Sequence, residues 1–282
     1  MTQRATIDVD GIPISYLTAG PRGPLVLLLH GTYWSRVWQP VMDDIAAAGL
    51  HPVAVDFPGF GRSGGELTSA EASIPQLSAW VVRFLEAMGN RAPVMVAGHD
   101  IGGGVAQHLL INRAVEVSRL ALVNAVTYDS WPVPGVARFR DPAVRAATST
   151  EDVLAARGQS VMKALARPAS EAEIAEYLEP WTDARVARSW LTLASAADNR
   201  YTLELLPALR QSLTPKLLIW GEDDGFQTVD YAERFAAEIP ATRLVRIRSA
   251  GHIPMENNAS AVASAMAEFF ADTHDIVEQS GG

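Results

Sequence analysis

The sequence has 282 residues, 48% of them hydrophobic, which is enough for one large globular unit with a sizeable core. Its formal net charge of −9 argues against a protein that binds nucleic acid or an anionic membrane through a basic face. The absence of cysteine excludes disulfides, thiolate metal sites and a cysteine nucleophile.

Strand and helix patterns alternate along the first half of the chain. Several short apolar runs are continuous, as expected for strands that are buried on both faces of a sheet. Segments with helical periodicity separate them and often end at glycine. The expected strands are 5–9, 14–18, 24–30, 51–56, 93–97 and 118–124, and the expected helices are 37–48, 74–88 and 102–112.

The pattern changes over residues 127–207, which lack buried-strand runs and have helical spacing. The alternation then resumes, with strands expected at 216–220 and 242–247 and helices at 229–237 and 261–271. This order predicts an α/β fold with a mostly parallel, eight-stranded sheet, helices on both faces and a helical cap inserted after the sixth strand. We therefore expect a core domain of residues 1–126 and 208–275, a cap of residues 127–207 and a flexible tail of residues 276–282.

The strongest chemical signal is Gly98-His99-Asp100-Ile101-Gly102, which lies directly between an expected strand and an expected helix. It has the form of a nucleophile elbow, a sharp turn that lifts its central side chain above the sheet. Glycines two positions either side of the nucleophile avoid a steric clash in this turn. The start of the following helix is a favourable place for a carboxylate. Taken alone, the pattern fits Asp100 as a nucleophile and Asp100 as only a helix N-cap equally well.

Three further motifs follow other expected strands. His30-Gly31-Thr32 lies where half an oxyanion hole would be, so the backbone N–H groups of Thr32 and Ile101 are the candidate donors. The segment Trp220-Gly221-Glu222-Asp223-Asp224 supplies an acid, and Ala250-Gly251-His252 supplies a histidine. Nucleophile, acid and histidine thus follow one another in the order expected of a catalytic triad on such a sheet.

With these motifs and Asp56-Phe57-Pro58-Gly59-Phe60-Gly61-Arg62-Ser63, the chain resembles the α/β-hydrolase superfamily over essentially its whole length. An Asp in the elbow is similar to epoxide hydrolases and to haloalkane and fluoroacetate dehalogenases, whereas esterases and lipases carry Ser. The resemblance implies that Asp100 forms an alkyl ester with the substrate and that a water activated by His252 hydrolyses it. Asp224 matches the family spacing for the acid that orients His252. Asp223 and Asp129 are alternative acids.

The resemblance leaves the leaving group open. Epoxide hydrolases use cap tyrosines to polarise the epoxide oxygen, and Tyr177 and Tyr201 are the candidates here. Haloalkane dehalogenases usually carry Trp after the nucleophile and often Asn after His-Gly, positions that are Ile101 and Thr32 in this chain. Fluoroacetate dehalogenases carry Arg after the nucleophile. In this chain, the indole N–H groups of Trp34 and Trp181 could instead bind the departing halide. We expect epoxide hydrolysis on a small to medium apolar epoxide, with haloalkane or haloacid dehalogenation as the alternative.

Other classes fit the sequence less well. An ester or lactone hydrolase would be expected to have an elbow serine, and a non-catalytic ligand-binding protein would not need His252. The histidines lack metal-ligand spacing, so no metal and no cofactor are expected. Nothing at the N-terminus resembles a signal peptide, so a cytoplasmic enzyme is expected. Its expected partner is a small-molecule substrate, with no nucleic acid and no membrane, and a homodimer is possible.

Overall fold

Eight strands form one continuous sheet in the computed structural model, which describes residues 1–20 and 23–272. The expected tail, 276–282, lies outside these residues. Along the sheet the strands follow the order β1-β2-β4-β3-β5-β6-β7-β8. Their bounds are β1 Gln3–Val9, β2 Ile12–Thr18, β3 Leu25–Leu29, β4 His51–Val55, β5 Val94–Asp100, β6 Val117–Ala125, β7 Lys216–Gly221 and β8 Thr242–Ile247.

The sheet is mixed but mostly parallel. Strand β2 pairs antiparallel with both β1 and β4, whereas every pairing from β4 to β8 is parallel. The parallel strands end at the same edge of the sheet, and this is where such sheets bind ligands. The expected fold class and strand number are therefore confirmed.

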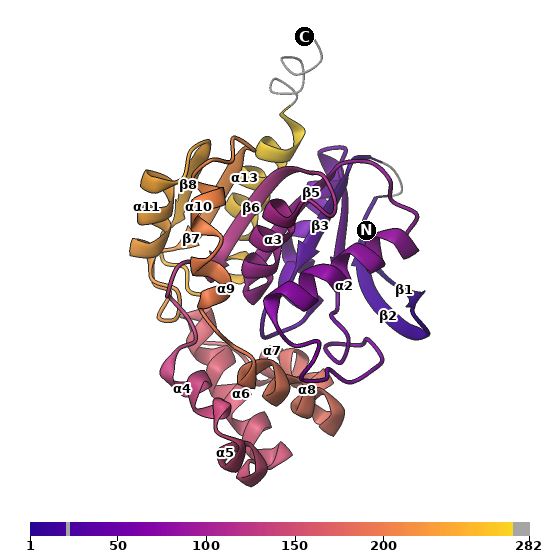
Figure 1. Cartoon of the computed structure of the whole chain (residues 1–282), viewed down its shortest axis with the longest axis vertical. Helices are drawn as coiled ribbons and strands as arrows, with labels where there is room; N and C mark the ends of the chain where they lie inside the picture. Colours follow the sequence, from indigo (N-terminus) through magenta and orange to yellow (C-terminus); the bar gives the residue numbers. More distant parts are fainter. Residues whose placement is uncertain (21–22, 273–282) are drawn as a thin grey trace.

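Helices cover both faces of the sheet (Figure 1). Helices α2, α3 and α11 pack with one buried cluster, and α1 and α13 pack with the other. Successive residues of β3 alternate between these clusters, as the pleat of a strand requires. The bounds are α1 Gln39–Ala47, α2 Ile74–Ala87, α3 Ile101–Asn112, α11 Val229–Glu238, α12 Pro254–Asn257 and α13 Ala259–Ala271.

A helical insert follows β6; most of it lies together at one end of the sheet, and its last two helices, α9 and α10, lie beside the core (Figure 1). Its α-helices are α4 Pro134–Ala137, α5 Pro142–Ala147, α6 Thr150–Leu165, α7 Glu171–Leu178, α8 Ala184–Ser195, α9 Arg200–Leu203 and α10 Leu206–Leu209. Short 3₁₀ segments are Ser35–Trp38 before α1, and Arg138–Arg140 and Glu179–Thr182 within the insert. No helix within residues 1–20 and 23–272 is long and apolar enough to cross a bilayer.

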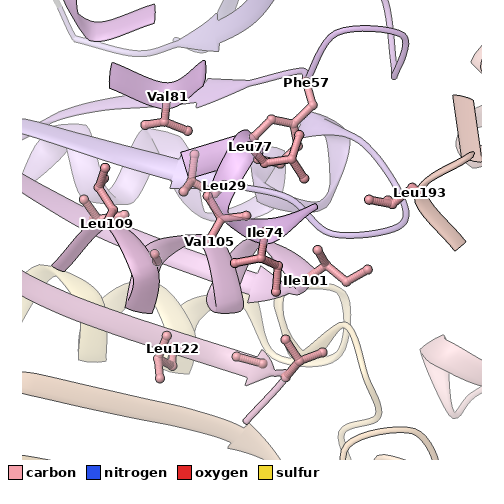
Figure 2. Close-up of a cluster of buried hydrophobic side chains, with 14 of the residues drawn as sticks. Leu29, Phe57, Ile74, Leu77, Val81, Ile101, Val105, Leu109, Leu122 and Leu193 are labelled. Carbon is pink, nitrogen blue, oxygen red and sulfur yellow. The ribbon is translucent and has the colours of Figure 1, made fainter. Parts of the chain in front are cut away.

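The insert shares its core with the sheet. Leu193 of α8 belongs to the same buried cluster as Leu29 of β3 and Ile101 of α3. Figure 2 shows Leu193 approaching this cluster from the side of the insert, with Ile101 at the near end of α3. Apolar burial of this kind, worth roughly 25 cal/mol per Å², fixes the insert over the carboxyl ends of the parallel strands.

Candidate active site

Asp100 lies on a sharp turn between β5 and α3. Its backbone has φ 54° and ψ −125°, a positive φ that costs free energy for a residue other than glycine. The residue is only 7% exposed. The turn is the elbow that the sequence predicts, and it places the Asp100 carboxylate at the N-terminus of α3, where the helix dipole favours negative charge.

The glycines around Asp100 allow backbone segments to approach closely. A Cβ on Gly98 would lie 2.3 Å from the carbonyl oxygen of Gly102, and one on Gly102 would lie 2.4 Å from that of Leu29. A Cβ on Gly31 would lie 2.4 Å from Oδ2 of Asp100. Because these obstacles are mostly backbone atoms, side chains at Gly98 and Gly102 would displace the turn itself.

We therefore expect Gly98→Ala to destabilise the protein by about 3 kcal/mol through overpacking. The matched control is Gly135→Ala, because a Cβ at Gly135 meets no atom within 4 Å. Thermal denaturation should show a melting temperature several degrees lower for Gly98→Ala and unchanged for Gly135→Ala. Equal melting temperatures for the two variants would contradict the close packing of the elbow.

The backbone N–H of Thr32 donates a hydrogen bond to Oδ2 of Asp100 over 3.0 Å. Thr32 follows β3 in the loop fixed by His30, whose Nε2 accepts from the N–H of Phe57 and whose Nδ1 donates to the Gly31 carbonyl. Thr32 and Ile101, the predicted oxyanion-hole pair, both line the cavity beside Asp100. The Thr32 donor is placed where negative charge would develop on the Asp100 carboxyl group.

His252 faces Asp100 from the loop after β8. Its Nε2 lies 4.0 Å from Oδ1 of Asp100, and its Nδ1 lies 2.8 Å from Oδ2 of Asp224. Because the Asp224 carboxylate accepts at Nδ1, the Nε2 atom of a neutral His252 is left as a base. The structure thus brings together Asp100, His252 and Asp224, the three residues that the sequence predicts as a catalytic triad.

Asp224 is held by groups that the sequence did not nominate. Asn124 donates from Nδ2 to Oδ2 of Asp224 and accepts at Oδ1 from the N–H of Gly221. The N–H of Phe226 donates to Oδ1 of Asp224. The alternative acids lie elsewhere, since both Asp223 and Asp129 are exposed.

Burial and charge act in opposite directions on His252. Burial opposes protonation of the imidazole, but the adjacent Asp224 carboxylate outweighs it, and the pKa of His252 is raised above its ordinary value of 6.5. His99 lies beside it, with ring centroids 4.8 Å apart. Burial lowers the pKa of His99 to about 4, so His99 is neutral and donates from Nε2 to the backbone carbonyl of His252. His99 therefore helps to fix the backbone of His252 and adds no charge.

A cavity of about 80 Å³ lies over Asp100 and His252, between the sheet and the insert. This is smaller than the several hundred Å³ typical of pockets for drug-sized ligands, so it suits a small substrate. The lining residues are Thr32, Tyr33, Asp100, Ile101, Val126, Trp131, Pro132, Val133, Val136, Arg157, Ser160, Ala197, Phe226, Gln227 and His252.

The four predicted substrate contacts do not line this cavity. The Tyr177 hydroxyl donates to Oε1 of Glu256, and the Trp34 indole donates to the carbonyl of Tyr177. Tyr201 packs against the buried cluster that contains Leu29 and Ile101. Trp181 is buried, and the Arg157 guanidinium lies over its ring. Tyr177, Trp181 and Tyr201 lie in the insert and Trp34 lies in the loop after β3, but the sequence did not give the direction in which each side chain points.

Arg157 and Gln227 are cavity residues that the sequence analysis missed. Arg157 lies on α6 four residues from both Val153 and Val161, which are buried. The sequence signal that could have identified Arg157 was a charged residue at helical spacing from these two valines, on the apolar face of the helix. Within residues 1–20 and 23–272, no group of three or more His, Cys, Asp or Glu residues could hold a metal ion.

The sequence matches the Alpha/beta hydrolase family over residues 26–265. It is 27% identical to a haloalkane dehalogenase from Bradyrhizobium diazoefficiens, covering 96% of this chain and 95% of that protein. A shorter match, 36% identical over 122 residues, is to the dihydrolipoyllysine-residue acetyltransferase component of the acetoin cleaving system from Cupriavidus necator. It covers 43% of this chain and 32% of that protein.

Solved structures support the same fold. A haloalkane dehalogenase from Bradyrhizobium elkani USDA94 superposes with a TM-score of 0.81 at 23% identity, covering 96% of this chain and 98% of that one. An epoxide hydrolase, CorEH, gives a TM-score of 0.79 at 22% identity, covering 96% and 99%. From the extent of the family match and the agreement in fold, we conclude that this chain belongs to the alpha/beta hydrolase family.

Proposed function

We propose that this chain is a hydrolase that removes halide from a small halogenated substrate, with Asp100 as the nucleophile. The observation that carries the proposal is the placement of the Asp100 carboxylate on the elbow, between the Thr32 N–H and the His252 imidazole. A carboxylate there is suited to displacement at saturated carbon, which yields an alkyl ester of Asp100 and a free halide.

The second half of the reaction would use the remaining groups. His252 Nε2 accepts a proton from a water that attacks the carbonyl carbon of the Asp100 ester. The Thr32 N–H, already bonded to Oδ2 of Asp100, stabilises the oxyanion that this attack creates. Asp224 holds the His252 tautomer and balances the charge of the imidazolium. The alcohol is then released and the Asp100 carboxylate is regenerated.

Two observations favour halide loss over the epoxide opening that the sequence analysis preferred. Two full-length curated relatives are named haloalkane dehalogenases. The cap tyrosines expected to protonate an epoxide oxygen, Tyr177 and Tyr201, do not line the cavity. The Tyr177 hydroxyl is instead bonded to Glu256. Without those hydroxyls, the leaving alkoxide of an epoxide would lack its expected donors.

A panel of small substrates tests the proposal. Short chloro- and bromoalkanes and halocarboxylates are assayed by halide release, and short terminal epoxides by diol formation. We expect multiple-turnover halide release that slows strongly in Asp224→Asn but is kept in Asp223→Asn, because Asp224 contacts His252 and Asp223 is exposed. Diol formation without halide release would overturn the proposal in favour of epoxide hydrolysis.

The pH dependence of ester breakdown provides a further prediction. His252 must be neutral to act as a base, and its pKa is raised above 6.5 by Asp224. Breakdown should therefore accelerate as the pH rises through a midpoint above 6.5. In Asp224→Asn the midpoint should fall, because burial still opposes protonation of His252 and the attraction of the Asp224 carboxylate is lost. Single-turnover rates from pH 5 to 9 provide the measurement, and a rate independent of pH would contradict the role of His252.

A further inference from the structure

Arg157 is a buried cation beside the proposed nucleophile. It is 5% exposed, lines the cavity and projects from α6 of the insert. Within the part of the chain that the structure describes, no carboxylate forms a salt bridge with it. Burying a charge without a paired counter-ion costs free energy of folding, so a functional role would explain why an arginine lies here.

The Asp100 carboxylate attracts this guanidinium without forming a salt bridge with it, and hydrogen bonds and aromatic rings hold the guanidinium in place. Nη2 donates to the carbonyl of Thr32 over 3.2 Å and to its Oγ1 over 3.4 Å, and Nη1 donates to Oγ of Ser160 over 3.4 Å. Nε is buried with no hydrogen-bond partner. The guanidinium carbon lies 4.5 Å from the ring centroid of Tyr33 and 4.9 Å from that of Trp181. Aromatic faces attract a cation but do not satisfy its N–H groups, so donors remain for a ligand.

The cavity lining combines polar and apolar residues. Arg157, Thr32 and Asp100 supply polar groups, and Val126, Val133, Val136 and Trp131 supply apolar surface. The indole N–H of Trp131 is occupied by Thr202. A ligand that matches this lining has a small anionic group and a short apolar group.

We propose that Arg157 binds the carboxylate of a short 2-halocarboxylate substrate. This rests on the proposed function and names its substrate class. The planar guanidinium fork matches a carboxylate, and the charge offsets the repulsion between that carboxylate and the attacking Asp100. Because the reacting carbon is bonded directly to the carboxylate, a group held by Arg157 places that carbon near the elbow.

The reaction balances without a co-reactant other than water. An oxygen of Asp100 attacks the 2-carbon, the carbon–halogen bond breaks, and the halide leaves with the bonding electrons. Water then adds to the carboxyl carbon of Asp100, His252 takes its proton, and a 2-hydroxycarboxylate leaves. Overall, a 2-halocarboxylate and water give a 2-hydroxycarboxylate, halide and a proton.

Holding the departing halide is the alternative role for Arg157. The guanidinium contacts Thr32, the residue whose N–H is bonded to Asp100, and so lies close to the nucleophile. A carboxylate bonded directly to the reacting carbon would be held at this place, and comparing turnover of a carboxylate substrate with that of its amide separates the two roles.

Binding of an unreactive acid tests the inference without requiring turnover. Calorimetry with propanoate and propanamide is performed on the unmodified protein, Arg157→Met and Arg157→Lys. The control is Arg188→Met, an exposed α8 arginine paired with Glu66. We expect propanoate to bind more tightly than propanamide, and Arg157→Met to weaken propanoate binding by about 10- to 100-fold. Arg157→Lys should retain part of the binding, and Arg188→Met all of it.

Failure to bind propanoate more tightly than propanamide in the unmodified protein would overturn the inference, even if Arg157→Met does not fold. Unchanged propanoate binding in folded Arg157→Met would also overturn it. In turnover assays, Arg157→Met should lose activity on 2-chloropropanoate but not on 2-chloropropanamide. Equal losses on the two substrates would mean that Arg157 acts on the departing halide or on Asp100, and not on the substrate carboxylate. Propanoate binding without any halide release would instead contradict the proposed function and leave the anion site standing.

Discussion

Replacing His252 with glutamine is expected to stop the reaction after one halide per protein molecule. The displacement by Asp100 does not need His252, but hydrolysis of the resulting ester does. General-base catalysis contributes about 10²- to 10⁴-fold, so the ester should accumulate. Glutamine can still donate to Asp224, which accepts from Nδ1 of His252 in the structure, so the buried carboxylate keeps a partner. Intact mass should increase by the alkyl group of the substrate.

The controls for this trapping experiment separate the two steps. His108→Gln, on α3 and outside the cavity, should turn over normally and show no adduct. The double variant Asp100→Asn/His252→Gln should release no halide and gain no mass. An adduct that maps to any residue other than Asp100 would refute the proposed nucleophile.

Asp100→Asn is expected to lower turnover by at least about 10⁴-fold, because an amide oxygen is a far weaker nucleophile than a carboxylate. The fold should survive the change. Asparagine tolerates the positive φ of 54° at this position, and its side-chain oxygen can still accept from the Thr32 N–H. Halide release under saturating substrate, together with the melting temperature, provides the measurement.

Asp129→Asn is the matched control for this substitution. Asp129 is an exposed carboxylate at the start of the insert and lies outside the cavity, so its neutralisation should leave turnover unchanged. Near-normal activity in Asp100→Asn, at an unchanged melting temperature, would show that the elbow carboxylate does not attack the substrate.

The sheet could be predicted because its signals are local. Continuous apolar runs such as residues 24–30 are typical of strands buried on both faces of a parallel sheet, and the structure has β3 Leu25–Leu29 there. The elbow was equally visible, because glycine spacing reflects steric needs within a few residues. Its strand extends further than expected, since β5 continues to Asp100 instead of ending at Ala97.

The triad could be nominated because parallel strands bring their carboxyl ends to one edge. Sequence spacing favoured Asp224 over Asp223, and the structure places Asp224 against His252 and leaves Asp223 exposed. The contribution of Asn124 was not predictable in the same way. It depends on a hydrogen bond between β6 and the loop after β7, across 100 residues of sequence.

The insert was correctly predicted to be helical, but the residues with which it lines the cavity were not predicted. Short helices such as α4 and α9 are oriented by packing against neighbours, so composition cannot give the direction of a side chain. Tyr177 was expected to face the substrate and instead donates to Glu256. Arg157 was not among the predicted site residues and is buried against aromatic rings in the cavity wall.

The central claim is that Asp100 is covalently alkylated during turnover, and oxygen labelling tests it most directly. Excess protein is allowed a single turnover in water enriched in ¹⁸O, and the peptide containing Asp100 and the product are analysed by mass spectrometry. The account predicts ¹⁸O in the Asp100 carboxylate and unlabelled oxygen in the first product. Label in the product with none in Asp100 would mean that water attacks the substrate directly, and would contradict the account.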